Sequence, residues 1–118
     1  MSEANVVLAL VSRTEVTIEL RDGEIAASKL TLTLADVEAL IAGLAQLRMT
    51  MTPEIVREVP ESAHKTGVLG PPWAVARHPS AKEKTLFVRH PGFGWVTFVL
   101  PPEEANKMGN ALLTGQPP

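Results

Sequence analysis

The sequence predicts an α+β fold, an antiparallel sheet of five or six strands with two main helices. Short runs of alternating apolar and polar residues, separated by Gly and Pro turns, are typical of antiparallel strands. Two other segments, after Thr33 and after Pro101, repeat apolar residues at helical spacing. The 118 residues, 45% apolar and 20% charged, match one globular domain spanning 1–118.

The chain begins with the signals of strands. Val6–Val11 is an apolar run and a plausible first strand. Thr14–Thr33 predicts a β-hairpin, because apolar and polar residues alternate on both sides of Asp22-Gly23. Asp-Gly supplies the positive φ angles that a tight hairpin turn needs.

A helix is predicted directly after this hairpin. Thr33 can cap its first turn, with Asp36 completing a capping box. Leu32 and Val37 occupy the two positions of a hydrophobic staple. We expect the helix to end near residues 48–51. Its apolar stripe consists of Val37, Leu40, Ile41, Leu44 and Leu47.

The segment after this helix is rich in proline and glycine. Thr52-Pro53 is a second helix-start signal, so Glu54–Val59 is a candidate short helix. Residues 60–72 form the longest candidate loop, and loops of this length are often mobile or functional.

The second half predicts a three-stranded meander and a final helix. The expected strands are Trp73–His78, Thr85–His90 and Trp95–Leu100. Pro101 and Pro102 fit the first turn of the helix, and Gly115 ends it. The expected buried stripe is Ala105, Met108, Ala111 and Leu112.

The two halves resemble each other at a shift of 66 residues. This shift superposes 30–47 on 96–113 and makes seven of the eighteen positions identical. The chain would then be two strand-strand-strand-helix units, 1–48 and 71–118, joined by a linker at 49–70. Chance similarity between common residues is the alternative.

Charge and composition narrow the class of protein. The net charge is −2, but residues 1–62 carry −5 and residues 63–118 carry +3. The halves could therefore attract each other within or between chains. Basic charge is too sparse for a nucleic-acid binder. No apolar run is long enough for a signal peptide or a membrane span, so we expect a cytoplasmic protein without membrane or nucleic-acid partners.

Few residues are suited to catalysis, and no cofactor or metal is expected. The chain has no Cys and no Tyr. Glu61-Ser62-Ala63-His64 places a carboxylate, a hydroxyl and an imidazole together, although a polar surface loop explains this cluster better. His78 and His90 each lie in an Arg-His-Pro triplet, at opposite ends of the predicted strands. No metal signature accompanies them.

One aromatic cluster is a candidate ligand-binding site. If the meander strands pair as simple hairpins, both Trp73 and Trp95 face His90, beside Phe93. Such a group can clasp a ligand, a cation or a partner's side chain. The alternative is that the two indoles close the end of the core.

The same pairing makes both faces of the second sheet largely apolar, with Ala74, Ala76, Phe87, Phe98 and Leu100 on one face. A half-solvated antiparallel sheet normally has one polar face, so something must cover the second face. The leading hypothesis is an interaction module that homodimerises through an apolar sheet face. The alternatives are a ligand or peptide binder with the 60–72 loop as a lid, and an enzyme that pairs His90 or His64 with a glutamate.

Overall fold

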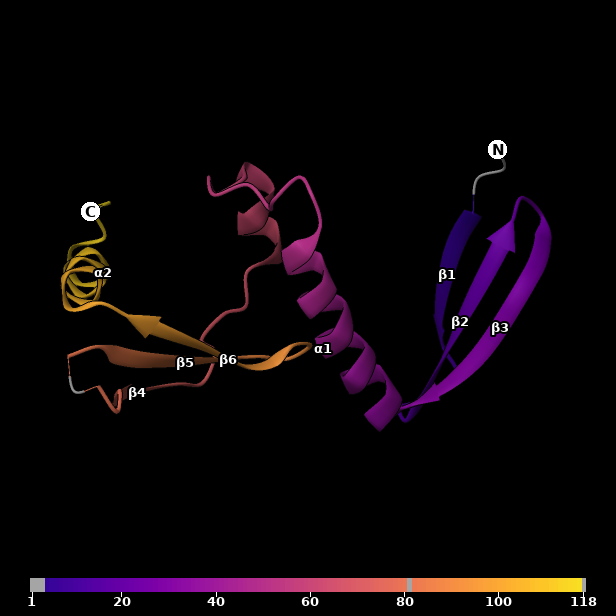
Figure 1. The fold of residues 1–118 in the computed structure, drawn as a ribbon, viewed down its shortest axis with the longest axis horizontal. Coiled ribbons are helices and arrows are strands. Elements are labelled where there is room, and N and C mark those ends of the chain that lie inside the picture. Colours follow the sequence, from indigo (N-terminus) through magenta and orange to yellow (C-terminus); the bar gives the residue numbers. More distant parts are fainter. Residues whose placement is uncertain (1–3, 81, 118) are drawn as a thin grey trace. The chain divides into compact units, whose positions relative to one another are not determined.

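The structure is a computed structural model that describes residues 4–80 and 82–117. The chain divides into two compact units, Met1–Val56 and Arg57–Pro118. Each unit is a three-stranded antiparallel sheet followed by one main helix (Figure 1). The predicted α+β class and the repeated strand-strand-strand-helix order are therefore confirmed. The six strands are divided between two sheets. That the units belong to a single domain stays a prediction.

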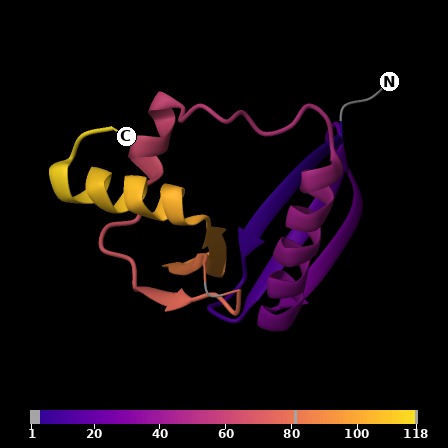
Figure 2. The same ribbon diagram turned by 60° about the vertical axis from the view of Figure 1, so that its left-hand side comes forward.

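The first unit contains β1 (Ala4–Leu10), β2 (Glu15–Asp22), β3 (Ile25–Thr33) and the helix α1 (Leu34–Thr50). Strand β2 lies between the other two. Its turn to β3 contains Gly23 at φ 64°, as the Asp-Gly signal predicts. Helix α1 follows β3 without a loop (Figure 2).

Alternation gives this sheet two different faces. Leu8 pairs with Ile18, and Ile18 pairs with Leu30, so one face is apolar across all three strands. On the opposite face Val7 pairs with Glu19, and Glu19 pairs with Lys29. The apolar face is the one that must be covered.

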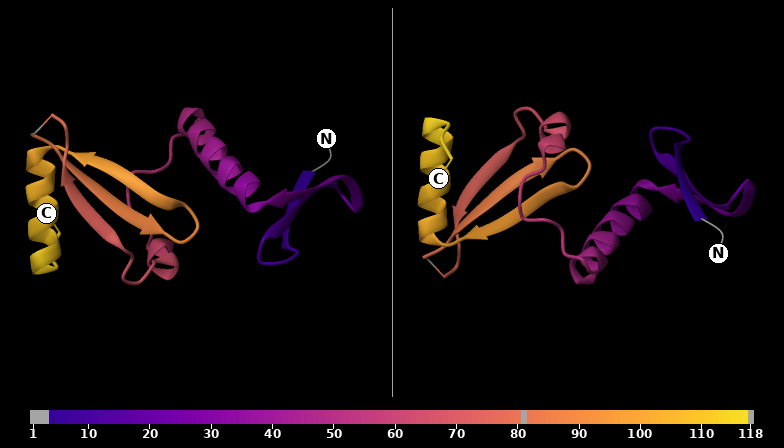
Figure 3. Two further views of the ribbon diagram at one scale, coloured as in Figure 1. Left: turned by 90° about the horizontal axis from the view of Figure 1, so that it is seen from below. Right: turned by 90° about the horizontal axis from the view of Figure 1, so that it is seen from above.

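The second unit begins with a short 3₁₀ helix, η1 (Glu61–Thr66). It continues with β4 (Trp73–Arg77), β5 (Lys84–His90), β6 (Gly94–Leu100) and the helix α2 (Pro102–Thr114). Strand β5 is central. The helix ends at Gly115, whose φ of 68° is the left-handed conformation that a C-terminal glycine supplies. Figure 3 shows α2 turning back beside its own sheet.

The structure changes the spacing of the repeat. The helix caps Thr33 and Pro101 lie 68 positions apart, and the pairs Ile18–Leu30 and Leu86–Phe98 are also related by 68. A shift of 66 does not superpose the two ladders. Structurally equivalent positions therefore share apolar character and order of elements, while the seven identities at a shift of 66 fall on non-equivalent positions.

The predicted helix at Glu54–Val59 is wrong, because this segment is irregular and the short helix lies at Glu61–Thr66. Ile55 and Val56 are β-branched, and Pro60 disfavours a helical Val59. A six-residue segment adds too few hydrogen bonds to offset nucleation. Among the described residues, no helix has the length and apolar character needed to cross a bilayer.

Candidate functional site: two open apolar clefts

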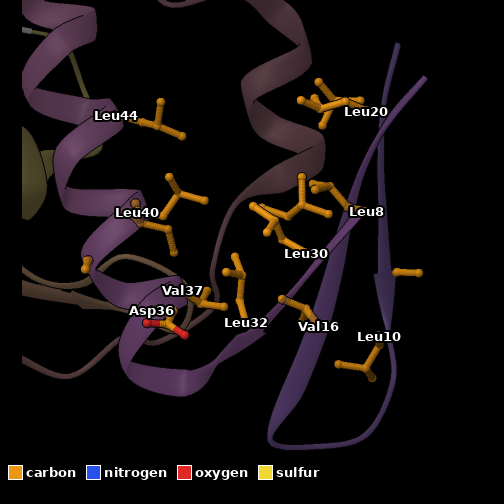
Figure 4. Close-up of a pocket in the computed structure, with 15 residues that line it drawn as sticks. Leu8, Leu10, Val16, Leu20, Leu30, Leu32, Asp36, Val37, Leu40 and Leu44 are labelled. Atoms are coloured by element: carbon orange, nitrogen blue, oxygen red, sulfur yellow. The ribbon is translucent and has the colours of Figure 1, made fainter. Parts of the chain in front are cut away.

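The apolar face of the first sheet and the apolar stripe of α1 form an open cleft, here called cleft A. It has a volume of about 1120 Å³. Figure 4 shows Leu40 and Leu44 of α1 pointing toward Leu8, Leu20 and Leu30 of the sheet across it. Helix and sheet meet where β3 leads into α1, and α1 packs mainly against β3. The rest of the apolar face is open.

No apolar residue whose side chain the structure describes is buried, so neither unit has a closed core. In cleft A, Leu8 is 70% exposed and Leu44 is 56% exposed. Burying such a side chain is worth roughly 1.5–3 kcal/mol. Cleft A is therefore a large apolar surface exposed to water, and covering it would be favourable.

Helix α1 is apolar beyond the stripe that faces its own sheet. Its middle, Ala39–Ala45, spans almost two turns without a polar side chain. Leu34 and Leu47, which do not line cleft A, are 58% and 62% exposed. A helix that is apolar all round is normally buried on every side. Contact with a single sheet therefore leaves part of the apolar surface of α1 exposed.

The second unit has an equivalent opening, here called cleft B, with a volume of about 830 Å³. Trp73, Val75, Leu86 and Val88 line it from the sheet, and Met108 and Leu112 line it from α2. Leu112 is 79% exposed. Three residues of the predicted stripe, Ala105, Met108 and Leu112, line the cleft, with Gly109 in place of Ala111, but none of them is buried as predicted.

Charge is almost absent from both clefts. The lining of cleft A has one charged residue, Asp36, and that of cleft B has one, Lys84. Asp36 already has a structural task, because its carboxylate accepts the Thr33 N–H at 3.0 Å. This hydrogen bond, with that of the Thr33 hydroxyl, lowers the pKa of Asp36. Both clefts are therefore almost wholly apolar.

The structure does not bring Trp73, His90 and Trp95 into one row. Trp73 faces Val88, His90 faces Gly94, and Trp95 faces Arg89. The expected register is wrong by two positions in the first hairpin and by one in the second. A one-position slip moves side chains to the other face, so Trp73 lines cleft B while Trp95 lies on the opposite face.

Two of the four predicted ligand-binding residues do meet. The rings of His90 and Phe93 are 4.6 Å apart, and His90 Nδ1 accepts the N–H groups of Gly92 and Phe93 at 2.9 and 3.1 Å. In the other Arg-His-Pro triplet, His78 Nδ1 accepts the Ser80 N–H at 3.2 Å. Both histidines therefore close the turn that follows them. A ligand-binding role for Trp73, His90, Phe93 and Trp95 stays a prediction.

The residues proposed for catalysis gain no partner. Glu61, Ser62 and His64 lie on η1, and no hydrogen bond joins them. Within the described part of the chain, no histidine pairs with a glutamate, and no three His, Asp or Glu side chains cluster as metal ligands. The geometry thus offers the enzyme hypothesis no acid–base pair.

The expectation of two apolar faces on the second sheet also changes with the register. Phe98 and Leu100 pair with Leu86 and Lys84, so they lie on the face that lines cleft B. The opposite face has Phe87 and Trp95 but also Arg89. The surface that needs covering is therefore the cleft side of each sheet.

Comparison of the chain with protein-family models, with curated proteins and with solved structures finds no match. The two clefts are therefore the features of the chain that bear on its function. Sequence reasoning missed cleft A as a site, although its signals were present in the alternation through Val6, Leu8 and Leu10 and in the apolar middle of α1.

Proposed function

We propose that this chain is a self-associating protein-interaction module, in which a second copy covers the apolar sheet faces that cleft A and cleft B leave open. The observation that carries the proposal is the exposure of both apolar faces to solvent. Each helix touches the end of its sheet and leaves most of the apolar face uncovered. An exposed apolar surface of this extent on a folded chain is typical of an interaction site.

The surface area agrees with an association of this kind. The chain exposes 10379 Å² at a mass of 12.7 kDa. Two unconnected compact bodies of half this mass would together expose about 7,500 Å². The excess of roughly 2,900 Å² exceeds the roughly 1,000–2,500 Å² that each subunit contributes to an obligate dimer.

The charges of the chain do little to oppose self-association. Residues 1–56 carry four basic and eight acidic side chains, and residues 57–118 carry seven and five. Their net charges are therefore −4 and +2. The whole chain therefore carries only −2, and the apolar clefts supply most of the affinity.

The test is the mass of the full chain in solution, measured by size-exclusion chromatography with light scattering from micromolar to submillimolar concentration. A dimer is expected throughout the upper range. A monomer at the highest concentration overturns the proposal, because the clefts are then closed without a second copy.

A pair of matched variants locates the interface. Leu40→Asp places a charge in cleft A, whereas Leu69→Asp places the same charge on a side chain that is 100% exposed and lines neither cleft. Burying an unpaired carboxylate costs several kcal/mol. Leu40→Asp is expected to dissociate the dimer and Leu69→Asp to leave it intact, with far-UV circular dichroism showing that both chains stay folded.

The cytoplasmic location predicted from the sequence is part of this proposal. It is supported by the lack of Cys and of a long apolar run. Fractionation of cells that express the full chain tests it.

A further inference from the structure

The outer edge of β1 is an unpaired strand edge with an unusual composition. In the described sheet, β1 pairs only with β2, so its other side has no neighbour. From Ala4 to Val11 no residue is charged, and none is Gly or Pro. Natural edge strands are normally protected by charge, proline or brevity, because a bare edge adds the strand of another chain.

The hydrogen bonds show which backbone groups face outward. Val11 N–H donates to the Glu15 carbonyl at 3.0 Å, so Val11 directs its groups toward β2. In an antiparallel ladder this direction alternates along the strand. Val7 and Ala9 therefore also face β2. The N–H and C=O groups of Val6, Leu8 and Leu10 point away from the sheet.

The other sheet edges are better protected. Strand β4 has only five residues and lies between Pro72 and Pro79, and β3 carries Lys29. Strand β6 has no charged residue, but it begins with Gly94 and leads directly into Pro101. Among the described edge strands, β1 is thus the one without a charged residue, glycine or proline.

The apolar face is also least covered at this edge. Val6, Leu8 and Leu10 are 61%, 70% and 73% exposed. On the opposite face of the same strand lie Asn5, Val7 and Ala9, which are uncharged. A second β1 placed alongside would therefore meet no repelling charge on either face.

We propose that two copies of this chain join by antiparallel pairing of β1 with β1, centred on Val7, which makes one continuous six-stranded sheet. This inference rests on the proposed self-association and names the strand pair at its interface, here called the β1 seam. The pairing sets Val6 of one copy opposite Leu8 of the other, and both use outward-facing backbone groups. The cross-strand contact of Val6 with Leu8 buries part of the most exposed strip of each apolar face.

The first test is amide hydrogen exchange of the full chain at a concentration where it is a dimer. The amides of Val6, Leu8 and Leu10 are expected to exchange at least about 100-fold more slowly than unpaired amides, because each donates across the seam. Rapid exchange of these three amides in a chain that is a dimer overturns the seam and leaves self-association standing. A monomeric chain overturns both.

The second test uses three lysine variants, one on each of the edge strands β1, β3 and β6. Each substituted position lies on the face of its sheet opposite the cleft. Val7→Lys sets like charges opposite each other across the β1 seam, whereas Thr31→Lys and Thr97→Lys place the same charge on β3 and β6. Val7→Lys is expected to weaken the dimer at least about tenfold and to release the three amides. The other two variants are expected to leave dimerisation unchanged.

A different outcome is equally informative. Weakening by Thr31→Lys or Thr97→Lys alone contradicts the proposal and moves the seam to β3 or β6. If Val7→Lys does not fold, Leu8→Pro removes an outward-facing N–H without touching the β1–β2 ladder, and proline is tolerated at such an edge position. Dimerisation of this variant at the affinity of the unaltered chain contradicts the proposal.

Discussion

Thr33 and Asp36 form reciprocal hydrogen bonds at the start of α1. The Thr33 N–H donates to the Asp36 carboxylate at 3.0 Å, and the Asp36 N–H donates to the Thr33 hydroxyl at 3.3 Å. This reciprocal pair closes the first turn of the helix and sets the direction in which α1 leaves β3. Asp36 also lines cleft A, so the pair lies at the end of the cleft where β3 leads into α1.

Removing the hydroxyl should destabilise the first unit. Thr33→Ala leaves the Asp36 N–H without its acceptor and is expected to lower the free energy of unfolding by about 1 kcal/mol. Urea denaturation followed by circular dichroism measures this change. Thr33→Ser keeps the cap and is the control, so an equal loss in both variants would contradict the assignment.

The same pair predicts a dependence on acid. Because the pKa of Asp36 in the folded chain lies below its ordinary value of 3.8, the unfolded chain binds the proton more readily. The stabilisation is complete only well above 3.8 and is lost progressively as the pH falls through 3.8 toward the folded pKa. Asp36→Asn is expected to remove this part of the pH dependence in denaturation curves measured from pH 6 to pH 2.5. Parallel acid curves for both chains would contradict it.

Two glycines are expected to respond in opposite directions to substitution by alanine. Gly23 has a φ of 64°, where a side chain is strained by roughly 1–2 kcal/mol, so Gly23→Ala should destabilise the first unit. Gly43 lies inside α1 with open space around it, so Gly43→Ala should stabilise the helix by about 0.5–1 kcal/mol. Urea denaturation of both variants checks the pair. Destabilisation by Gly43→Ala would reveal a close neighbour of α1 in the assembled protein.

Local signals predicted the elements well, because each signal is complete within a few residues. The capping box at Thr33, the Asp-Gly turn and the terminal Gly115 all occur where the sequence places them. The strands of the second unit were also predicted to within one residue at each end. None of these signals depends on which helices and strands pack against each other.

Register was the part that local signals could not determine. The turn after His90 has Gly94 at φ 77° and pairs His90 with Gly94, one position from the simple hairpin expected. This single position moves Phe98 and Leu100 to the face of cleft B and separates Trp95 from Trp73. The predicted aromatic row failed for this reason, although each residue lies on a predicted strand or turn.

The fixed role of His90 in this turn gives a further prediction. His90→Ala leaves the N–H groups of Gly92 and Phe93 without their acceptor and is expected to destabilise the second unit by about 1 kcal/mol. His64→Ala, on exposed η1, is the matched control and should change stability by less than about 0.5 kcal/mol. Thermal denaturation of the two variants measures the difference. Equal stability of both would show that the turn does not depend on the imidazole.

The two tryptophans provide separate probes of the two faces of the second sheet. Trp73, 70% exposed, lines cleft B, whereas Trp95, 55% exposed, lies on the opposite face. If a second copy covers cleft B, concentrating the chain should protect Trp73 from acrylamide and leave Trp95 accessible. The measurement is quenching of Trp95→Phe, which reports Trp73 alone, and of Trp73→Phe, which reports Trp95 alone, each below and above the dimerisation range. Protection of Trp95 in place of Trp73 would assign the interface to the other face of the sheet, and unchanged quenching of both would confine self-association to the first unit.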